Sequence, residues 1–541
     1  MTVNSNSKVS LRVKGNIHPI RVLFIYPNTF GMNMLPPAIA LFNALLKREG
    51  HSVRLFDATY YSIDYGVDSD GSKADNLNVV PYDPNEKGIR MKETSWFEDL
   101  HAEIENFSPN LIAVSTTEDM WNLGVSLLES IRGVIEKDEI PVIVGGVFPT
   151  FAPDLVIAHD LVDMVCIGEG EEALVDLCYR IGKGLDYEHV TNLWIKTAEG
   201  RLVKNSVTKP VDINALPMID ISLFEEARLY RPMAGKWYRM LPIETIRGCP
   251  YKCAYFNSPT QIEFYKENAS GGFFRKKKAN LVYDELKFFV DNYGLEYGYF
   301  WADTFLAMNS RELDEFCEMY QDIKLPFWMQ TRPETITDHK IKKLADVGLH
   351  RISFGIEHGN EEFRRKYLGR TFENKDVVER LKIPHEYGVQ FSVNNITGFP
   401  YETRELALDT IKLNKDIKSD NQNLYAFVPF HGTPLRKTAE ELGYIKHEDI
   451  TRCLTDKPML DQPQYPAEEI EGLQRCFVLY VGMPESRWGD IQKAEKNTPE
   501  GNKIFEELKD EYKSVYMQND DLKDEQPKVA DLEYGVESIN R

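Results

Sequence analysis

The sequence has few cysteines, no long apolar run and no excess of basic charge, and each shortage excludes a class of protein. Seven cysteines in 541 residues are too few for the disulfide framework of a small secreted scaffold. No stretch approaches the roughly 20 apolar residues of a membrane span or has the form of a secretory leader. The net charge of −21 repels nucleic-acid phosphates. These shortages predict a cytosolic (cytoplasmic) protein with no membrane span and with no nucleic acid as main partner.

The length and composition are typical of a large soluble protein with more than one domain. With 42% hydrophobic and 28% charged residues, the chain can bury a sizeable interior, yet 541 residues exceed one ordinary core. We therefore expect two substantial domains. Five scattered cysteines are expected to be buried structural thiols: Cys166, Cys178, Cys317, Cys453 and Cys476.

The first part of the chain alternates between predicted strands and helices. The apolar run 21–27 predicts a strand buried on both faces, a helical pattern follows over 36–49, and a second strand is predicted at 53–56. Further strands are predicted at 111–115 and 141–146. This alternation predicts an α/β fold, with a Rossmann-like doubly wound sheet over residues 20–185 after an N-terminal extension, 1–19.

A second alternation begins after a predicted linker with a hairpin at residues 186–240. Six strands, separated by helical stretches, are predicted within residues 241–440; they are 243–247, 297–301, 326–331, 350–356, 389–396 and 424–430. Six strand–helix repeats predict a partial (β/α)6 barrel rather than a complete eightfold one. Residues 441–541 are predicted to form a helical C-terminal region with a charged tail.

The sharpest motif is the segment RGCPYKCAYFN at residues 247–257, just after the first predicted barrel strand. Active sites of barrels lie at that end of the strands. The segment resembles the loop of the radical SAM family, whose C-x-x-x-C-x-x-C motif ligates three irons of a 4Fe-4S cluster and leaves the fourth open for S-adenosylmethionine (SAM). Cys249 and Cys253 match this motif, but the third ligand position is Phe256, which has no donor atom.

Three explanations for Phe256 remain open. The chain is an inactive relative that kept the scaffold, or it carries a natural or engineered change of an active enzyme, or it holds a cluster through two thiolates and a further ligand. A zinc enzyme using Cys249 and Cys253 is disfavoured because no histidine stands near them at the usual spacing.

Other barrel segments resemble the same family in the expected order. The resemblance implies that Tyr255 contacts the adenine of SAM, and that the ends of later strands bind its methionine and ribose parts. A core or loop salt bridge is the alternative role for Glu357. The SAM-binding residues implied by the resemblance are Tyr255, Asp303, Ser353, Gly355, Glu357, Asn395 and Gly398.

The N-terminal unit resembles the cobalamin-binding domain that precedes many radical SAM barrels. The resemblance lies in Pro36-Pro37, in GGVFPT at 145–150 and in IGEGE at 167–171, and no D-x-H-x-x-G pattern supplies a cobalt-ligating histidine. Small glycines allow a macrocycle or its tail close to the backbone, and hydroxyls suit amide or phosphate groups. The alternative is a sheet that has lost its ligand. The predicted cobalamin-binding residues are Ser115, Thr116, Thr117, Gly145, Gly146, Phe148, Gly168 and Glu169.

Together the two resemblances imply a methyltransferase that acts on a small-molecule substrate. A ferredoxin or flavodoxin would reduce the cluster, SAM would give a 5′-deoxyadenosyl radical that takes hydrogen from an unactivated carbon, and methylcobalamin would supply the methyl group. Relatives with the same parts carry out cyclisation or rearrangement. A non-catalytic corrinoid- or metabolite-binding protein is the alternative from another class, and Phe256 favours it.

Overall fold

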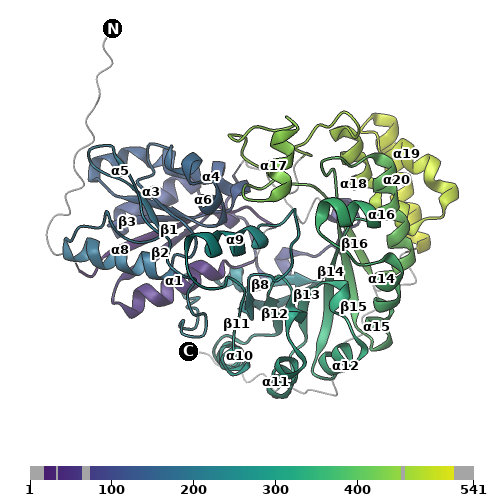
Figure 1. Ribbon diagram of the computed structural model, residues 1–541, viewed down its shortest axis with the longest axis horizontal. Coiled ribbons are helices and arrows are strands. Elements are labelled where there is room, and N and C mark those ends of the chain that lie inside the picture. The colour runs from purple at the N-terminus through teal and green to yellow at the C-terminus, as the bar shows by residue number, and fades with distance from the viewer. Residues whose placement is uncertain (1–17, 32–33, 64–72, 453–456, 517–541) are drawn as a thin grey trace, which may run out of the picture.

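The computed structural model describes residues 18–31, 34–63, 73–452 and 457–516 (Figure 1). Cys453, most of the predicted N-terminal extension and the charged tail from residue 517 lie outside the described residues. The other six cysteines are buried and reduced. No helix in the described ranges is long and apolar enough to cross a membrane.

The first sheet has seven strands in the order β2-β1-β3-β4-β5-β6-β7. The first five pair in parallel, and the last two are added as an antiparallel hairpin. The strands are β1 (Arg21–Tyr26), β2 (Ser52–Asp57), β3 (Leu111–Ser115), β4 (Val142–Gly145), β5 (Met164–Cys166), β6 (Leu193–Lys196) and β7 (Leu202–Lys204). The hairpin that the sequence predicted after residue 186 therefore extends the first sheet.

Helices cover both faces of this sheet, as the continuous apolar strands require. One core packs α3 and α4 against the sheet, and the other packs α1 and α8. The helices are α1 (Pro37–Arg48), α3 (Trp96–Phe107), α4 (Trp121–Ser130), α5 (Arg132–Asp138), α6 (Val147–Phe151), α7 (Pro153–Ile157) and α8 (Glu171–Lys183). The predicted doubly wound sheet is confirmed.

The second sheet is the partial barrel, in the order β16-β15-β14-β13-β12-β9-β8. Its strands from β9 to β16 run in parallel, and β8 forms an antiparallel edge. The strands are β8 (Tyr230–Met233), β9 (Lys236–Glu244), β12 (Tyr297–Trp301), β13 (Phe327–Thr331), β14 (Leu349–Glu357), β15 (Gln390–Thr397) and β16 (Asn421–Ala426). A short separate ribbon pairs β10 (Ile246–Arg247) with β11 (Arg275–Lys276).

An outer layer of helices packs on the barrel strands through one large apolar core. These helices are α10 (Ala279–Tyr293), α11 (Ser310–Tyr320), α12 (Asp338–Asp346), α14 (Asn374–Arg380), α15 (Lys382–Glu386) and α16 (Arg404–Ile417). Two further helices, α13 (Glu361–Phe363) and α17 (Pro434–Glu441), pack in a smaller apolar cluster. Helix α9 (Ser258–Asn268) packs against a core of the first domain through Phe264. The C-terminal helices α18 (Ala467–Gly482), α19 (Trp488–Ala494) and α20 (Pro499–Glu511) pack on α16 and β16 (Figure 1).

The two sheets meet where the strands of the first one end. The loop after β16 reaches the first domain, where His431 contacts both the Glu118 carboxylate and the Phe148 ring. The loop after β5 reaches the barrel, where Glu169 pairs with Arg247 just before the cysteine loop. Because ligands of parallel sheets lie at the carboxyl ends of their strands, this interface is the place to look for a site.

Candidate active site

The cysteine loop follows β10 and holds two buried thiols. The Cys249 backbone N–H donates to Ser258 Oγ at 2.8 Å, and its Sγ lies 3.4 Å from Thr304 Oγ1. Arg332 Nη1 donates to Cys253 Sγ at 3.3 Å. Burial raises the pKa of the Cys249 thiol, and hydrogen bonds from its neighbours oppose the rise. Contacts with neighbouring side chains therefore fix the positions of both sulfurs. At Cys253 the donor is the Arg332 guanidinium, and a charged donor of this kind stabilises a thiolate.

The third position of the loop does not share this geometry. The Phe256 side chain is 40% exposed and carries no donor. Cys317, the next cysteine along the chain, is buried in the core between α11 and the strands. The donor set in the loop is thus two thiolates, which does not fit a cluster held by three cysteines.

Glu357 lies at the end of β14 in a conformation that the surrounding residues impose. Its φ is +72°, and the register between β14 and β15 shifts at this point. A Cβ on Gly355 would lie 2.2 Å from Glu357 Oε1, so any larger residue would displace the carboxylate from this position. Left-handed φ at a non-glycine residue costs on the order of 1–3 kcal/mol and is typical of functional sites.

The Glu357 carboxylate is part of a buried ion pair. Arg370 Nη1 donates to Glu357 Oε1 and to the Gly355 carbonyl oxygen, both at 2.8 Å, and Tyr255 forms a further hydrogen bond to Glu357. Burial raises the pKa of Glu357, and Arg370 offsets part of that rise. The Glu357 carboxylate can accept more hydrogen bonds than Arg370 and Tyr255 supply, so it can also accept from a ligand. Tyr255, Gly355 and Glu357 are brought together, as the sequence predicted for SAM binding.

Two more predicted residues lie on neighbouring strands. Burial raises the pKa of Asp303 to about 6, against a hydrogen bond from Ser258, the same residue that holds Cys249. Ser353 Oγ accepts from Asn394 Nδ2 at 2.9 Å on the inner side of the barrel. Asp303 therefore borders the cysteine loop, and Ser353 lies deeper in the barrel than Glu357.

The structure places the last two predicted SAM residues in structural contacts. The Asn395 side chain is fully buried on the outer side of β15, where it exchanges two hydrogen bonds of 3.1 Å with Asn414 on α16. The Gly398 N–H donates to Glu402 Oε2 at 2.6 Å. The residue that faces the lumen from this segment is Asn394, beside Asn395. Contact of Asn395 and Gly398 with SAM stays a prediction.

Three side chains at the site were missed by the sequence prediction: Arg332, Arg370 and Asn394. Arg332 follows a predicted strand directly, and strand-end position was a usable signal for it. The period-2 alternation of β15 indicates that Asn394 and Asn395 face opposite sides, although it does not say which faces inward. Arg370 lies in a loop, and no sequence motif or strand end near it indicated a role at the site.

The carboxyl edge of the first sheet brings five predicted cobalamin residues together. They are Ser115, Thr116, Thr117, Gly145 and Gly146, at the ends of β3 and β4. Gly146 has a φ of +130°, and a Cβ there would overlap the Thr116 carbonyl oxygen. Gly146 and Thr117 are exposed, and Ser115 and Gly145 are partly exposed. Small, accessible residues at the ends of adjacent parallel strands fit the approach of a flat cofactor or its tail.

The other predicted cobalamin residues make contacts between the domains. Phe148 is buried against Trp121 and His431. A Cβ on Gly168 would meet the Tyr265 hydroxyl at 2.5 Å. Their contact with cobalamin stays a prediction.

Glu169 is at the centre of an interdomain ion-pair network. Arg275 pairs with its carboxylate, Arg247 Nη1 donates to Oε1 at 2.9 Å, and the Val211 N–H donates to Oε2 at 2.8 Å. Arg247 also pairs with Glu171 at 2.6 Å. Arg247 stands two residues before Cys249, so the network fixes the start of the cysteine loop to the first domain.

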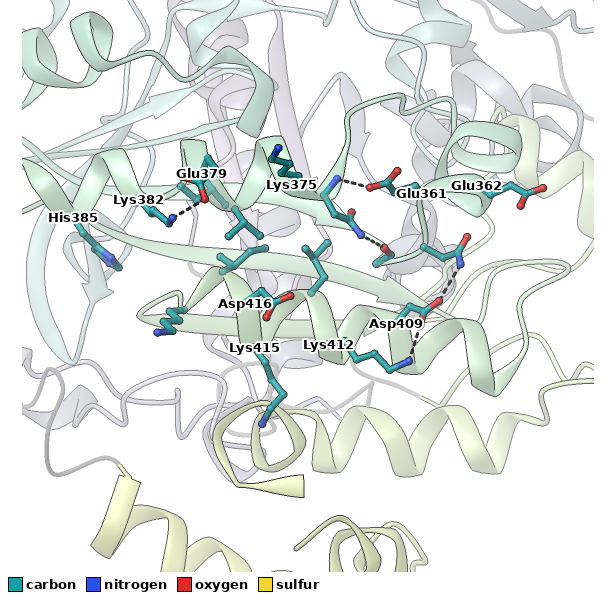
Figure 2. A pocket seen from close by; sticks show the side chains of 18 residues that line it. Glu361, Glu362, Lys375, Glu379, Lys382, His385, Asp409, Lys412, Lys415 and Asp416 are labelled. Atoms are coloured by element: carbon teal, nitrogen blue, oxygen red, sulfur yellow. Dashed lines mark hydrogen bonds and ion pairs between the residues drawn. The ribbon is translucent and has the colours of Figure 1, made fainter. Parts of the chain in front are cut away.

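A groove of about 970 Å³ lies elsewhere, on the outer helical layer (Figure 2). It runs between α14, α15 and α16, and its lining includes the apolar residues Val378 and Leu413. Lysines and carboxylates line it, and several are paired with one another, as Lys382 is with Glu379 at 2.7 Å. The groove is formed by the outer side of the barrel layer, whereas the cysteine loop lies at the carboxyl ends of the strands.

Known proteins resemble the chain in both halves. Residues 243–413 match the radical SAM superfamily, and residues 72–178 match the B12 binding domain. An uncharacterised methyltransferase from Pyrococcus horikoshii is 24% identical over 408 residues, which are 74% of this chain and 85% of the relative.

Solved structures show the same fold at lower sequence identity. The radical SAM methyltransferase TsrM from Kitasatospora setae, with tryptophan and a SAM analogue bound, superposes with a TM-score of 0.58 at 17% identity, covering 79% of this chain and 77% of TsrM. The cobalamin-dependent SAM radical enzyme OxsB, with aqua-cobalamin and SAM bound, gives 0.62 at 14% identity, covering 92% and 72%.

Proposed function

The chain joins a B12-binding domain to a radical SAM domain, and from this premise we propose that it has the scaffold of a cobalamin-dependent radical SAM methyltransferase for an unactivated carbon of a small molecule, impaired by Phe256. The relative from Pyrococcus horikoshii and the neighbour TsrM are both methyltransferases by name, which supports this type of enzyme. When bound, SAM and cobalamin would supply the methyl group that such an enzyme transfers. We further propose a ferredoxin or flavodoxin as electron donor and the cytoplasm as location.

The observation that carries the proposal is the convergence of two sets of strand ends. The SAM-type residues Tyr255, Glu357 and Arg370 lie in one buried network at the carboxyl ends of the barrel strands. The first sheet presents its own carboxyl edge at the same interface, through Glu118–His431 and Glu169–Arg247. Two cofactors that exchange a group need such neighbouring sites, whereas a protein that binds only a corrinoid has no use for the barrel network.

The chain's own residues would bind and orient SAM. Arg370 pairs with the Glu357 carboxylate and offsets part of the pKa rise that burial causes, and the carboxylate oxygens can accept hydrogen bonds from ribose hydroxyls or an amino group. Asp303 follows β12 and Ser353 lies on β14, so both are close to this network. On the first sheet, Ser115 and Thr117 would meet polar groups of the corrinoid.

The cysteine loop lacks the third ligand that a 4Fe-4S cluster of this family needs. Because Phe256 offers no ligand, no reaction step is assigned to a cluster in this chain. We propose that Phe256 impairs the cluster of an otherwise complete scaffold. The exposure of its side chain supports this, because an exposed phenylalanine does not fill the space that a cluster would need.

The test is metal content and SAM cleavage after anaerobic reconstitution. We expect Phe256→Cys to hold about four irons with sulfide and to form 5′-deoxyadenosine, and the chain as it stands to do neither. Phe288→Cys is the matched control, since Phe288 is equally exposed on α10. SAM cleavage by the unchanged chain would mean a further ligand. Failure of Phe256→Cys to bind iron would overturn the enzyme proposal in favour of a corrinoid-binding relative, which cobalamin binding without SAM cleavage would support.

A further inference from the structure

Two histidines lie together where the chain after β16 meets the first domain. The side chain of His431 is buried, whereas that of His447 is 52% exposed, and their rings are 5.2 Å apart in an edge-to-face arrangement. Glu440 of α17 lies beside them, and one ligand atom from each of the three residues lies within 4.8 Å of the other two. Two imidazoles and a carboxylate gathered in this way are donors that suit a divalent zinc ion.

The contacts of His431 need a positive charge that a neutral ring does not carry. The Glu118 carboxylate accepts the backbone N–H groups of His431 at 2.8 Å and of Thr451 at 3.0 Å, and it also faces His431 Nδ1 at 2.8 Å. Nδ1 therefore carries the single hydrogen of a neutral imidazole. Nε2 nevertheless lies 2.8 Å from the His447 carbonyl oxygen, so two acceptors would face each other. A second proton on the ring or a bound metal ion removes this repulsion.

The surroundings of the two rings favour a metal ion over a proton. A proton on His431 Nε2 satisfies the carbonyl oxygen but gives no reason for Glu440 and the His447 ring to gather beside it. His447 Nδ1 lies 3.9 Å from Glu440 Oε1, and His447 Nε2 lies 3.1 Å from Asp154 Oδ2. Both histidines thus turn one ring nitrogen to a carboxylate of the first domain, which is how metal-binding histidines are usually held. The nitrogens left for an ion are Nε2 of His431 and Nδ1 of His447.

Arg436 adds a positive charge to this cluster but does not cancel its negative charge. It donates to Glu440 Oε1 at 2.7 Å and to the His447 carbonyl oxygen at 3.1 Å, and its Nη1 lies 3.7 Å from Glu118 Oε1. A carbonyl oxygen has two lone pairs and a carboxylate about four, so Glu440 can still bind an ion. The carboxylates of Glu118, Glu440 and Asp154 carry three negative charges against the one positive charge of Arg436. The remainder is two negative charges, which a divalent ion neutralises.

An ion can reach the cluster from solvent with small side-chain movements. The side chains of His447 and Glu440 are 52% and 27% exposed. Nitrogen and oxygen ligands at about 2.1 Å from one tetrahedral zinc ion lie about 3.4 Å apart, so the donor atoms must approach one another by about 1 Å. Rotation of the two exposed side chains supplies this movement, while Glu118 keeps the buried His431 ring in place.

We propose that His431, His447 and Glu440 bind a zinc ion, and that Glu118 and Asp154 orient the two histidines from the first domain. The ion connects the chain after β16 to the first domain, because a carboxylate of that domain holds each histidine ligand. None of these residues belongs to the sets predicted for SAM or cobalamin. The inference therefore goes beyond the proposed function and does not depend on it.

Zinc titration of the full chain tests the proposal. The protein is first treated with a chelator, and dissociation constants for Zn²⁺ alone are measured by isothermal titration calorimetry. His447→Ala removes an exposed ligand, so the protein should still fold, and zinc binding should weaken at least about tenfold. His339→Ala, at an exposed position on α12, is the matched control and should leave the constant unchanged.

Two further variants separate this site from other zinc ligands. Asp154→Asn changes a residue that orients His447 without touching the ion, and loss of such a partner typically weakens metal affinity about 10–100-fold. The Asp154 side chain is 60% exposed, so folding should not depend on it. Cys253→Ser removes a thiol of the cysteine loop that can itself bind zinc, and it should leave the constant of the proposed site unchanged.

The pattern across the variants decides the inference. Zinc binding that is weakened by His447→Ala and Asp154→Asn, but not by His339→Ala or Cys253→Ser, supports it. Absence of saturable binding overturns it, and so does binding that responds only to Cys253→Ser; in both cases His431 holds a second proton instead of a metal ion. None of these results depends on SAM cleavage, so the inference and the proposed function can fail separately.

Discussion

At the residue scale, the site contains buried charged side chains, and an ion pair with a neighbouring residue offsets the cost of burying each charge. Glu357 occupies a left-handed backbone conformation next to a glycine, and Arg370 compensates its charge. Burial opposes the charge on Arg370, but Tyr255 and Glu357 outweigh burial and raise its pKa. A buried ion pair is weak evidence of net stabilisation, so its presence here agrees with the proposed SAM-binding role of Glu357.

Removal of Arg370 should be costly. Arg370→Met leaves the Glu357 carboxylate buried without its counter-charge, and we expect the free energy of unfolding to fall by about 3–5 kcal/mol. Urea denaturation at neutral pH measures this. Arg311→Met is the control, because Arg311 pairs with Glu315 on the surface with 89% of its side chain exposed, and such pairs contribute about 0–1 kcal/mol. A loss no larger than that of the control would show that Glu357 is solvated or protonated in the folded protein.

At the element scale, the turn from β4 into α6 fixes the backbone at the carboxyl edge of the first sheet. Gly146 has a φ that other residues rarely adopt, and a Cβ added to it would lie 2.2 Å from the Thr116 carbonyl oxygen on the neighbouring strand end. The sequence predicted that a glycine here lets a cofactor approach the backbone. In the structure the group that comes close to Gly146 is the protein's own Thr116 carbonyl. Any corrinoid would meet an edge that is already fixed.

Substitution at this turn should damage both stability and corrinoid binding. For Gly146→Ala we expect a loss of about 3 kcal/mol in the free energy of unfolding, from the strained φ and the steric overlap. Gly133→Ala in α5, with open space around the added methyl, should be neutral or stabilising by about 0.5–1 kcal/mol. Thermal unfolding and spectrophotometric cobalamin titration of both variants give the comparison. Equal behaviour of the two variants would mean that the turn relaxes freely.

At the scale of the whole molecule, ion pairs connect the domains directly beside the cysteine loop. Glu169 accepts from Arg247, Arg275 and the Val211 backbone, and Glu118 accepts from His431 and from the Thr451 N–H at 3.0 Å. Residues more than 300 positions apart are thus fixed to one another. The domains are expected to unfold together as long as this network is complete.

Glu169→Gln tests that expectation. It removes the charge that compensates Arg247 and Arg275, so we expect the free energy of unfolding to fall by about 1–3 kcal/mol and the two domains to unfold at different urea concentrations. Fluorescence and far-ultraviolet circular dichroism followed on the same samples would then give separate midpoints. Glu172→Gln, exposed on α8, should keep the midpoints coincident. Coincident midpoints in Glu169→Gln would show that apolar contacts alone couple the domains.

The sequence by itself determined the fold class and indicated the position of the candidate site. Apolar runs at strand length, separated by helical patterns, specify two layered α/β units because each strand must bury both faces. The motif around Cys249 and Cys253, together with the segment ending at Glu357, predicted the candidate site, because active sites of barrels lie at the carboxyl ends of their strands. The position of Phe256 in that motif was visible at once.

Only the tertiary structure decided which side chains share a surface. Arg370 and Arg332 come from separate loops, and their pairing with Glu357 and Cys253 depends on how strands far apart in sequence lie side by side. Asn394 and Asn395 differ in sequence position by one residue, yet one faces the lumen and the other faces α16. Glu169, predicted at a cofactor, lies in an ion pair with Arg247, because docking of the two domains brings these charges together. Local pattern fixes the elements, whereas long-range packing selects the partners of each polar group.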